Sequence, residues 1–337
     1  MSVKTYAQAL GEALIEIMEE DPKFAIIGRN ILGHGAHADG EKPLMERFGD
    51  RVTDPPTSEG AAASMGIGAA MSGLRMFVHF GTASFALEAW NQLIHEAGTA
   101  HSMSGGQIRV PIVFHMYHGL RGGGGAQHSI SPQSMLANNP GLQLMMPTCP
   151  GDVKGMLRAA IKSDNPVMFI DQAGLLGTEG EADDARYEIP LGKASVRREG
   201  KDVTIVATSR AVLWALEAAE MLAKDGIDAE VVDPRSIIPL DEDTIVASIE
   251  KTGRLVTVEE SIQMCSIGSE IAALAAERAF SSLKAPVQRV ARASAPVSFA
   301  PPLEEAVSQS CQNCGSRQAH YRVSLKHHGE PHERAVR

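Results

Sequence analysis

The sequence has few aromatic residues, few cysteines and no excess of positive charge, and each shortage excludes a class of protein. Aromatic residues make up 4% of the 337 residues, so the core must be mainly aliphatic, which suits helices packed on a parallel sheet. Four cysteines are too few for a disulfide framework and favour a reducing, cytoplasmic location. The net charge of −10 argues against a nucleic-acid partner, because little basic surface is left to neutralise phosphates.

Long apolar runs and the common phosphate-binding loops are also missing. No window of about 18 apolar residues occurs, so we expect no membrane span. The first 24 residues predict an amphipathic helix and not a signal peptide, because no basic flank precedes an apolar core. Neither G-x-x-x-x-G-K-[ST] nor a G-x-G-x-x-G that follows a strand is present, so these loops give no reason to expect nucleotide binding.

Helical and strand patterns alternate along most of the chain. This alternation predicts an α/β protein of two doubly wound domains with mainly parallel sheets. Residues 174–188 are acidic and aperiodic, so we place domains at 1–188 and 189–315, followed by a tail at 316–337. The expected strands are 23–28, 75–80, 111–116, 142–146, 166–171, 202–208, 229–234, 254–259 and 286–290, and the expected helices are 4–19, 60–73, 84–101, 152–163, 210–224, 241–251 and 266–281.

Two stretches of the first half carry residues capable of chemistry. Glu59 stands where a loop meets a predicted helix, either as a first-turn acid favoured by the helix dipole or as a functional carboxylate. Four glycines at 122–125 precede His128, which indicates either a flexible surface turn or a backbone that approaches a ligand closely. Ser129 is not expected to be a nucleophile, because no G-x-S-x-G elbow surrounds it.

The C-terminal region holds a Cys-x-x-Cys pair. Cys311 and Cys314 have the spacing of half a zinc site, and four histidines follow. No second pair exists and the histidine spacing is irregular, so an ordinary tail is the favoured interpretation.

Several motifs in a fixed order give the chain a resemblance to a known family. Together they resemble the β subunits of thiamine-diphosphate-dependent 2-oxo acid dehydrogenases, a pattern that acetoin dehydrogenase β subunits share. The resemblance covers residues 4–308. The motifs are 51–60 (RVTDPPTSEG), 66–70 (GIGAA), 85–92 (FALEAWNQ), 103–106 (MSGG), 127–129 (QHS), 140–142 (PGL), 192–194 (GKA), 202–206 (DVTIV), 230–235 (EVVDPR), 239–241 (PLD), 251–255 (KTGRL) and 259–260 (EE).

This resemblance implies a transketolase-like pyrimidine-binding domain followed by a transketolase C-terminal domain. The aminopyrimidine of thiamine diphosphate would bind this chain, and the diphosphate and Mg²⁺ would bind an α subunit through a Gly-Asp-Gly motif that this chain lacks. The implied partners are two α subunits, a second β chain, a lipoyl-bearing acyltransferase and a small-molecule substrate. Residues 60–73 would lie in a helix–helix subunit contact or, alternatively, only in the core of one chain.

The resemblance also assigns roles to particular residues. Glu59 would hydrogen-bond a ring nitrogen of the aminopyrimidine and so favour its imino tautomer, and Phe85 would stack on the pyrimidine. Thr57 and Glu88 would be neighbouring cofactor-binding positions. His128 would stabilise or protonate intermediates and guide transfer to the lipoyl group.

A potassium site is implied as well. In some family members K⁺ is bound mainly by backbone oxygens, and the matching positions here are Ile112, Ala160, Ile161, Ser163 and Asn165, where Ser163 replaces a common Asp.

Departures from the family pattern leave the substrate open. Arg29 and Asn30 replace two acids, and Asn91 replaces another. The expected activity is oxidative decarboxylation of a 2-oxo acid with acyl transfer to a lipoyl carrier. Acetoin cleavage, the C-terminal half of a split transketolase and a non-enzymatic scaffold subunit remain as alternatives.

Overall fold

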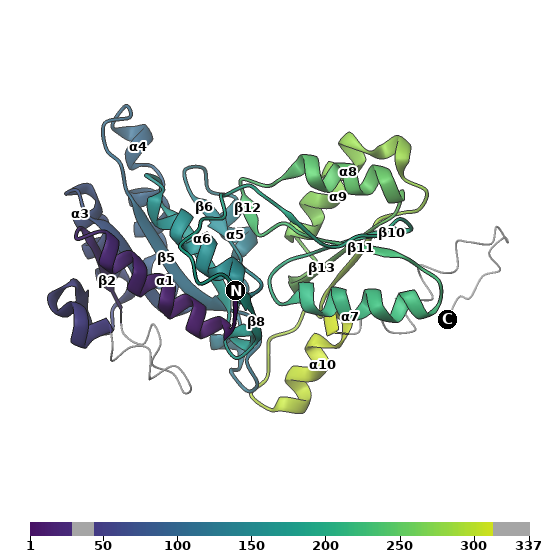
Figure 1. Ribbon diagram of the computed structural model, residues 1–337, viewed down its shortest axis with the longest axis horizontal. Coiled ribbons are helices and arrows are strands. Elements are labelled where there is room, and N and C mark those ends of the chain that lie inside the picture. The colour runs from purple at the N-terminus through teal and green to yellow at the C-terminus, as the bar shows by residue number, and fades with distance from the viewer. Residues whose placement is uncertain (29–43, 313–337) are drawn as a thin grey trace.

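Two α/β halves lie side by side in the computed structural model, which describes residues 1–28 and 44–312 (Figure 1). The departures at Arg29 and Asn30, Cys314 and the histidines after it lie outside the described residues. Within those residues no helix is long and apolar enough to cross a membrane.

A seven-stranded sheet forms the first half. Its strand order is β12-β6-β7-β5-β4-β2-β3, and all neighbours are parallel except β12 and β6. Helices α1 (Tyr6–Glu20) and α6 (Pro150–Lys162) pack together on one face, and α3 (Glu59–Met71) covers the other. The strands are β2 (Phe24–Ile27), β3 (Val52–Thr53), β4 (Arg75–Thr82), β5 (Ile112–His118), β6 (Gln143–Met145), β7 (Val167–Gln172) and β12 (Ser236–Ile238).

A five-stranded sheet forms the second half, with the order β14-β13-β10-β11-β9. Only β9 (Ser195–Arg198) is antiparallel to its neighbour. The doubly wound, mainly parallel architecture is therefore confirmed. The remaining elements are β10 (Val203–Ala207), β11 (Ala229–Asp233), β13 (Leu255–Ile262), β14 (Gln288–Arg292), α7 (Ala211–Lys224), α8 (Glu242–Thr252), α9 (Ile267–Arg278) and α10 (Pro301–Gln312).

The sheets are joined in two ways. Residues 183–194, in which the expected boundary at residue 188 falls, connect β8 (Glu179–Ala182) to β9, and β8 pairs with β1 (Ser2–Thr5) near the N-terminus. From the second half, β12 returns to the edge of the first sheet and pairs with β6. Ion pairs also connect the two halves here, because Arg197 and Arg235 of the second half both contact the carboxylate of Asp152 in α6. The second half thus completes the sheet of the first.

The prediction of one regular helix over 84–101 is wrong. The segment is helical, but it consists of the 3₁₀ helix η2 (Phe85–Ala89), the π-helical turn η3 (Gln92–Ala97) and the short α4 (Ala100–Met103). Apolar residues three to five positions apart fit all three windings, so periodicity does not distinguish them. Leu93 and Ala97 of η3 still face the core.

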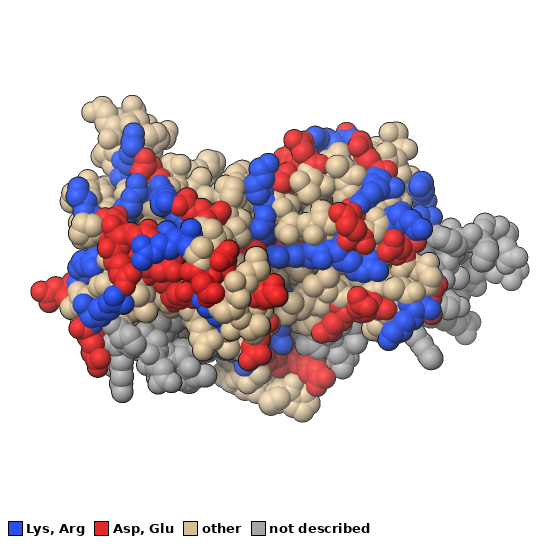
Figure 2. All heavy atoms as spheres, viewed as in Figure 1, with Lys and Arg blue, Asp and Glu red and all other residues tan. Residues whose placement is uncertain are grey.

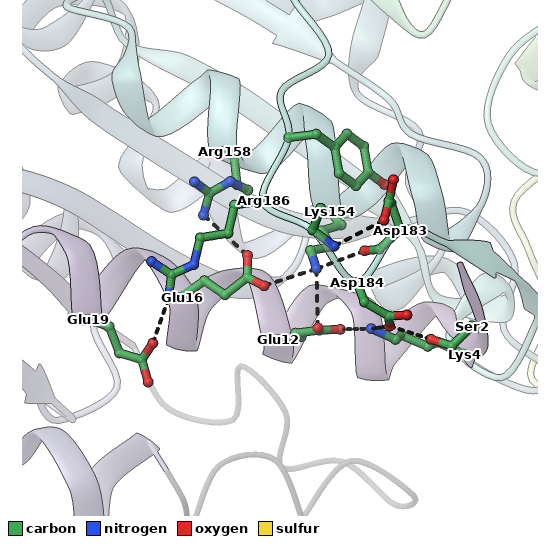
Figure 3. Close-up of polar contacts among 12 residues, drawn as sticks. Ser2, Lys4, Glu12, Glu16, Glu19, Lys154, Arg158, Asp183, Asp184 and Arg186 are labelled. Carbon is green, nitrogen blue, oxygen red and sulfur yellow. Dashed lines mark hydrogen bonds and ion pairs between the residues drawn. The ribbon is translucent and has the colours of Figure 1, made fainter.

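Helix α1 is held on α6 by a cluster of ion pairs. Figure 3 shows Lys154 of α6 between two carboxylates of α1, with Nζ 3.1 Å from Glu12 Oε1 and 2.9 Å from Glu16 Oε1. Lys154 also donates to the carbonyl oxygen of Asp183, at 3.0 Å. Figure 2 shows acidic and basic side chains mixed over the face that α1 occupies. Because Lys154 is fully buried, these partners must replace its hydration.

Replacing Lys154 with Ala should lower the free energy of unfolding by about 3–5 kcal/mol, because Glu16 loses a buried cationic partner. The matched control is Lys162→Ala at the end of the same helix. Its exposed pair with Glu188 predicts a loss of at most about 1 kcal/mol. Urea unfolding monitored by circular dichroism measures both changes, and equal losses in the two variants would contradict the importance of the buried cluster.

Candidate active site

The carboxyl ends of β3, β4 and β5 carry all the residues expected at the catalytic and cofactor site. Thr57 and Glu59 follow β3, Phe85 and Glu88 follow β4, and His128 follows β5. These strands are parallel members of one sheet, so their carboxyl ends lie at the same edge. In open α/β sheets ligands bind outside this edge.

Glu59 is the first residue of α3. Ser58 caps the helix by accepting a hydrogen bond from the Ala61 backbone amide, at 3.4 Å. The helix dipole favours a carboxylate in this first turn, so the structural and the catalytic interpretations of Glu59 are compatible. The side chain is half-buried, which leaves it accessible to a ligand.

Small residues of α3 bring Glu59 close to the segment after β4. A side-chain carbon at Gly60 would lie 3.5 Å from the carbonyl oxygen of Glu88, in van der Waals contact with η2. A side-chain carbon at Gly66 would lie 2.5 Å from Val78 Cγ2, so only glycine lets the helix lie this close to β4. The Ala- and Gly-rich sequence of α3 therefore lets the helix that carries Glu59 pack closely on β4 and on η2, which carries Phe85 and Glu88.

Phe85 and His128 come from different loops and meet edge to face. Their ring centroids are 5.3 Å apart with an interplanar angle of 77°. The Ser84 hydroxyl donates to the carbonyl oxygen of Gln127 and ties the same two loops together. Phe85 keeps 37% of its surface exposed, which leaves room for a planar ring to stack on it.

The tautomer of His128 follows from its neighbour. Its Nδ1 lies 3.1 Å from the carbonyl oxygen of Gly124. A carbonyl can only accept, so Nδ1 carries the proton, and in the neutral ring Nε2 keeps its lone pair. Nε2 is thus the atom of His128 that can exchange a proton with a ligand.

Part of the glycine run is explained by contacts within the chain. Gly125 has φ +66°, and a side-chain carbon there would lie 2.5 Å from Cε1 of Phe299. Gly123 has φ +99° and faces the Phe299 carbonyl oxygen. The sequence suggested a ligand or a flexible turn, but these two glycines allow the segment before α10 to pack on the loop.

Two carboxylates that the sequence analysis did not assign to the site also bind this loop. Glu260 of β13 accepts from the Leu120 amide, and Glu304 of α10 accepts from the next three amides of the chain. Both side chains are buried. Glu260 belongs to a motif used only for the family resemblance, whereas Glu304 gave no signal in the sequence.

His118, at the end of β5, faces the second half. Its ring lies 3.1 Å from Ser209 Oγ and 3.3 Å from Ser131 Oγ. Burial, with a smaller contribution from Arg121, lowers the pKa of His118 to about 3. A neutral imidazole therefore lies where the carboxyl end of β5 contacts the second half.

Two of the five residues expected to bind potassium, Ile161 and Ser163, contact Arg75. Arg75 Nη1 donates to the carbonyl oxygens of Ile161 and Ser163, both at 2.9 Å. The Ser163 hydroxyl donates to Gln143, at 2.7 Å. A potassium ion bound by these carbonyls would have to displace the guanidinium, so the arrangement does not fit the ion as it stands, and the potassium site stays a prediction. The other expected positions, Ile112, Ala160 and Asn165, are at the start of β5, in α6 and just after α6.

No group of three or more His, Cys, Asp or Glu side chains in residues 1–28 and 44–312 is placed to hold a metal ion. The described part of the chain therefore offers no such cluster for Mg²⁺.

Comparison with known proteins gives matches along most of the chain. Residues 2–178 match the transketolase pyrimidine-binding domain family, and residues 192–313 match the transketolase C-terminal domain family. Subunit β-1 of the mitochondrial pyruvate dehydrogenase E1 component of Arabidopsis thaliana is 43% identical over 305 residues, covering 89% of this chain and 84% of that protein.

Bacterial relatives have similar identities. The β subunit of acetoin:2,6-dichlorophenolindophenol oxidoreductase of Cupriavidus necator is 40% identical, covering 88% of this chain and 91% of that protein. The 2-oxoisovalerate dehydrogenase β subunit of Bacillus subtilis is 39% identical, covering 90% and 94%. Among solved structures, an inactive β4 tetramer of a split-gene transketolase matches with a TM-score of 0.76 and 24% identity, covering 95% of this chain and 98% of that one, which supports the fold alone.

Proposed function

Because the chain belongs to the family of β subunits of thiamine-diphosphate-dependent 2-oxo acid dehydrogenases, we propose that it catalyses oxidative decarboxylation of a 2-oxo acid together with an α subunit. The observation that carries this proposal is the meeting of Phe85 and His128 at the sheet edge where α3 presents Glu59. An exposed aromatic face can stack on an aminopyrimidine ring, and a carboxylate and a histidine can exchange protons at such a site.

The residues fit the pyrimidine end of the cofactor. When bound, thiamine diphosphate supplies the electron sink for decarboxylation. Phe85 offers a stacking surface for the pyrimidine, and Thr57 and Glu88 are proposed as neighbouring cofactor-binding positions. The Glu59 carboxyl group shares a proton with a ring nitrogen and so controls the tautomer of the ring. The diphosphate and Mg²⁺ are proposed to bind the α subunit.

His128 is proposed to serve the substrate side of the site. Its Nδ1 proton is engaged by Gly124, so Nε2 donates or accepts the proton at the reacting group. A lipoyl-bearing acyltransferase is the proposed acceptor of the acyl group.

Acetoin is the second candidate substrate. The acetoin oxidoreductase β subunit of Cupriavidus necator matches this chain at 40% identity, close to the 39% of the 2-oxoisovalerate dehydrogenase relative. The R-group pocket is expected to receive residues from both subunits, so only turnover can rank the substrates.

The outer face of α3 supports the proposed subunit contact. Its inner face is buried against β4 and β5, whereas Ala61, Ser64, Met65, Gly68 and Met71 are exposed along one side of the helix. Two of these are methionines with 48% and 39% of their surface exposed. Small and apolar side chains let another helix approach closely. The inner face of α3 therefore packs in the core of this chain, and its exposed face is the one proposed for the subunit contact.

Gly68→Leu should leave the chain folded but prevent assembly into the two-α, two-β complex. Apart from its chain neighbours and the backbone of the same helix, no atom lies within 4 Å of the position of a Cβ at Gly68, and the position is exposed, so the added side chain extends into open space. Leucine also favours helix more than glycine does. Light scattering of the co-expressed complex gives the mass. Ala223→Leu, on the exposed side of α7, is the control, and an intact complex with Gly68→Leu would argue against this contact.

Turnover of a substrate panel tests the proposed function. The chain would be purified with its α partner and supplied with thiamine diphosphate, Mg²⁺ and an artificial electron acceptor. Pyruvate, branched-chain 2-oxo acids and acetoin would be offered in turn. Cofactor-dependent activity on one of them is expected, and a well-formed complex inactive on the whole panel would favour a scaffold role or a sugar-phosphate substrate.

A further inference from the structure

The loop that carries His128 is held by the second half of the molecule through four consecutive backbone amides. Leu120 donates to Glu260. Arg121 and Gly122 donate to Glu304 Oε1, at 3.0 and 2.9 Å, and Gly123 donates to Glu304 Oε2. Figure 1 shows α10, which carries Glu304, at the lower edge of the molecule, near where the two halves meet.

Glu304 is buried although it is a carboxylate. It is 4% exposed, whereas its neighbour Glu305 on the same helix is exposed. Burying a carboxylate is costly unless hydrogen bonds replace its hydration. The three amides provide that replacement, so the conformation of residues 121–123 and the position of Glu304 depend on each other.

The residue that follows these amides contacts His128. Gly124, the next residue, accepts the hydrogen bond from His128 Nδ1. Gly125 then backs onto Phe299, which lies five residues before Glu304. Gly124, whose carbonyl sets the tautomer of His128, therefore directly follows the three residues whose amides bind Glu304.

We propose that Glu304 is a positioning residue for His128: its carboxylate fixes residues 121–123, and this fixes the carbonyl of Gly124 that orients the imidazole. The inference deepens the proposed function and rests on it. Glu304 does not touch the reacting atoms; it acts through the backbone. A residue that only anchored α10 would affect stability without changing how His128 works.

The test uses Glu304→Ala in the complete complex with the α partner. Loss of the carboxylate should lower kcat roughly 10- to 100-fold, as expected when a catalytic group is misplaced, with a smaller effect on KM. Acetate matches the atoms that the substitution removes, so sodium acetate should restore part of the lost kcat and sodium chloride should not. Glu305→Ala is the matched control and should behave as wild type.

Hydrogen exchange of residues 119–128, measured by mass spectrometry, provides a readout that does not require activity. Faster exchange in Glu304→Ala, slowed by acetate, is expected. Wild-type kcat in a well-formed Glu304→Ala complex, or a loss of kcat with unchanged exchange in this segment, would overturn the proposal. If the alanine variant does not assemble, Glu304→Gln, which keeps size and one acceptor, replaces it and is judged by kcat and hydrogen exchange without acetate. Inactivity of the wild-type complex would instead count against the proposed function.

Discussion

Glu59→Gln should lower turnover of the assembled enzyme by roughly 10²- to 10⁴-fold, the range associated with loss of a general acid–base group. Glutamine keeps the size of the side chain and an acceptor oxygen, but it cannot share a proton with a pyrimidine nitrogen. Ser58 continues to cap α3, so the helix should form normally. The loss is therefore expected in kcat and not in folding.

The measurement is dye reduction with the best substrate of the panel, alongside the dissociation constant of thiamine diphosphate. Glu96→Gln, an exposed acid of η3, is the control and should keep full activity. Wild-type turnover in Glu59→Gln would show that Glu59 has no role in the catalytic step. A large loss of cofactor affinity with unchanged kcat at saturation would assign it to binding alone.

His128→Asn should lower the overall reaction with a lipoyl acceptor by roughly 10²- to 10³-fold. The asparagine amide can still donate to the Gly124 carbonyl, so the loop should keep its conformation. What is lost is Nε2, the ring atom that can exchange a proton with a ligand. Dye reduction, which does not need transfer to a lipoyl group, should fall less than the overall reaction.

Comparing the two assays in the same preparation separates these steps. His101→Asn is a matched control, because the ring of His101 also contacts a backbone carbonyl, that of Ile108 at 2.9 Å, but it lies on α4. Equal activity of wild type and His128→Asn in both assays would exclude His128 from the chemistry. An equal loss of activity in both assays would assign His128 to a step before acyl transfer to the lipoyl group.

The strands and helices of the sheets were predictable because their burial is periodic. Short, fully apolar runs such as 167–170 are typical of the central strands of a parallel sheet. The order of the strands in the two sheets was not predictable, because it depends on pairing between segments that lie far apart in the sequence. Short elements at the edges, β1, β3, β8, β9 and β12, were missed because two to four residues give no periodic signal.

The residues of the candidate site that belong to motifs could be named from the sequence, whereas a residue that joins it through tertiary contact could not. The resemblance pointed to Glu59, Phe85 and His128, and the fold brings their elements to one edge. Glu304 lies 176 residues after His128, and its sequence context is that of an ordinary acid in a helix. Only the fold places it on the glycine loop, so no local pattern could have assigned it.

The return of β12 to the first sheet has a consequence for synthesis of the chain. Until the ribosome has added residues 236–238, the outer edge of β6 has no partner, and an unpaired parallel edge is a template for association with other chains. All other strands of the first sheet are therefore synthesised well before β12, the strand that covers its edge. A fragment cut near residue 188 would keep this open edge permanently and is a poor starting point for expressing the pyrimidine-binding half alone.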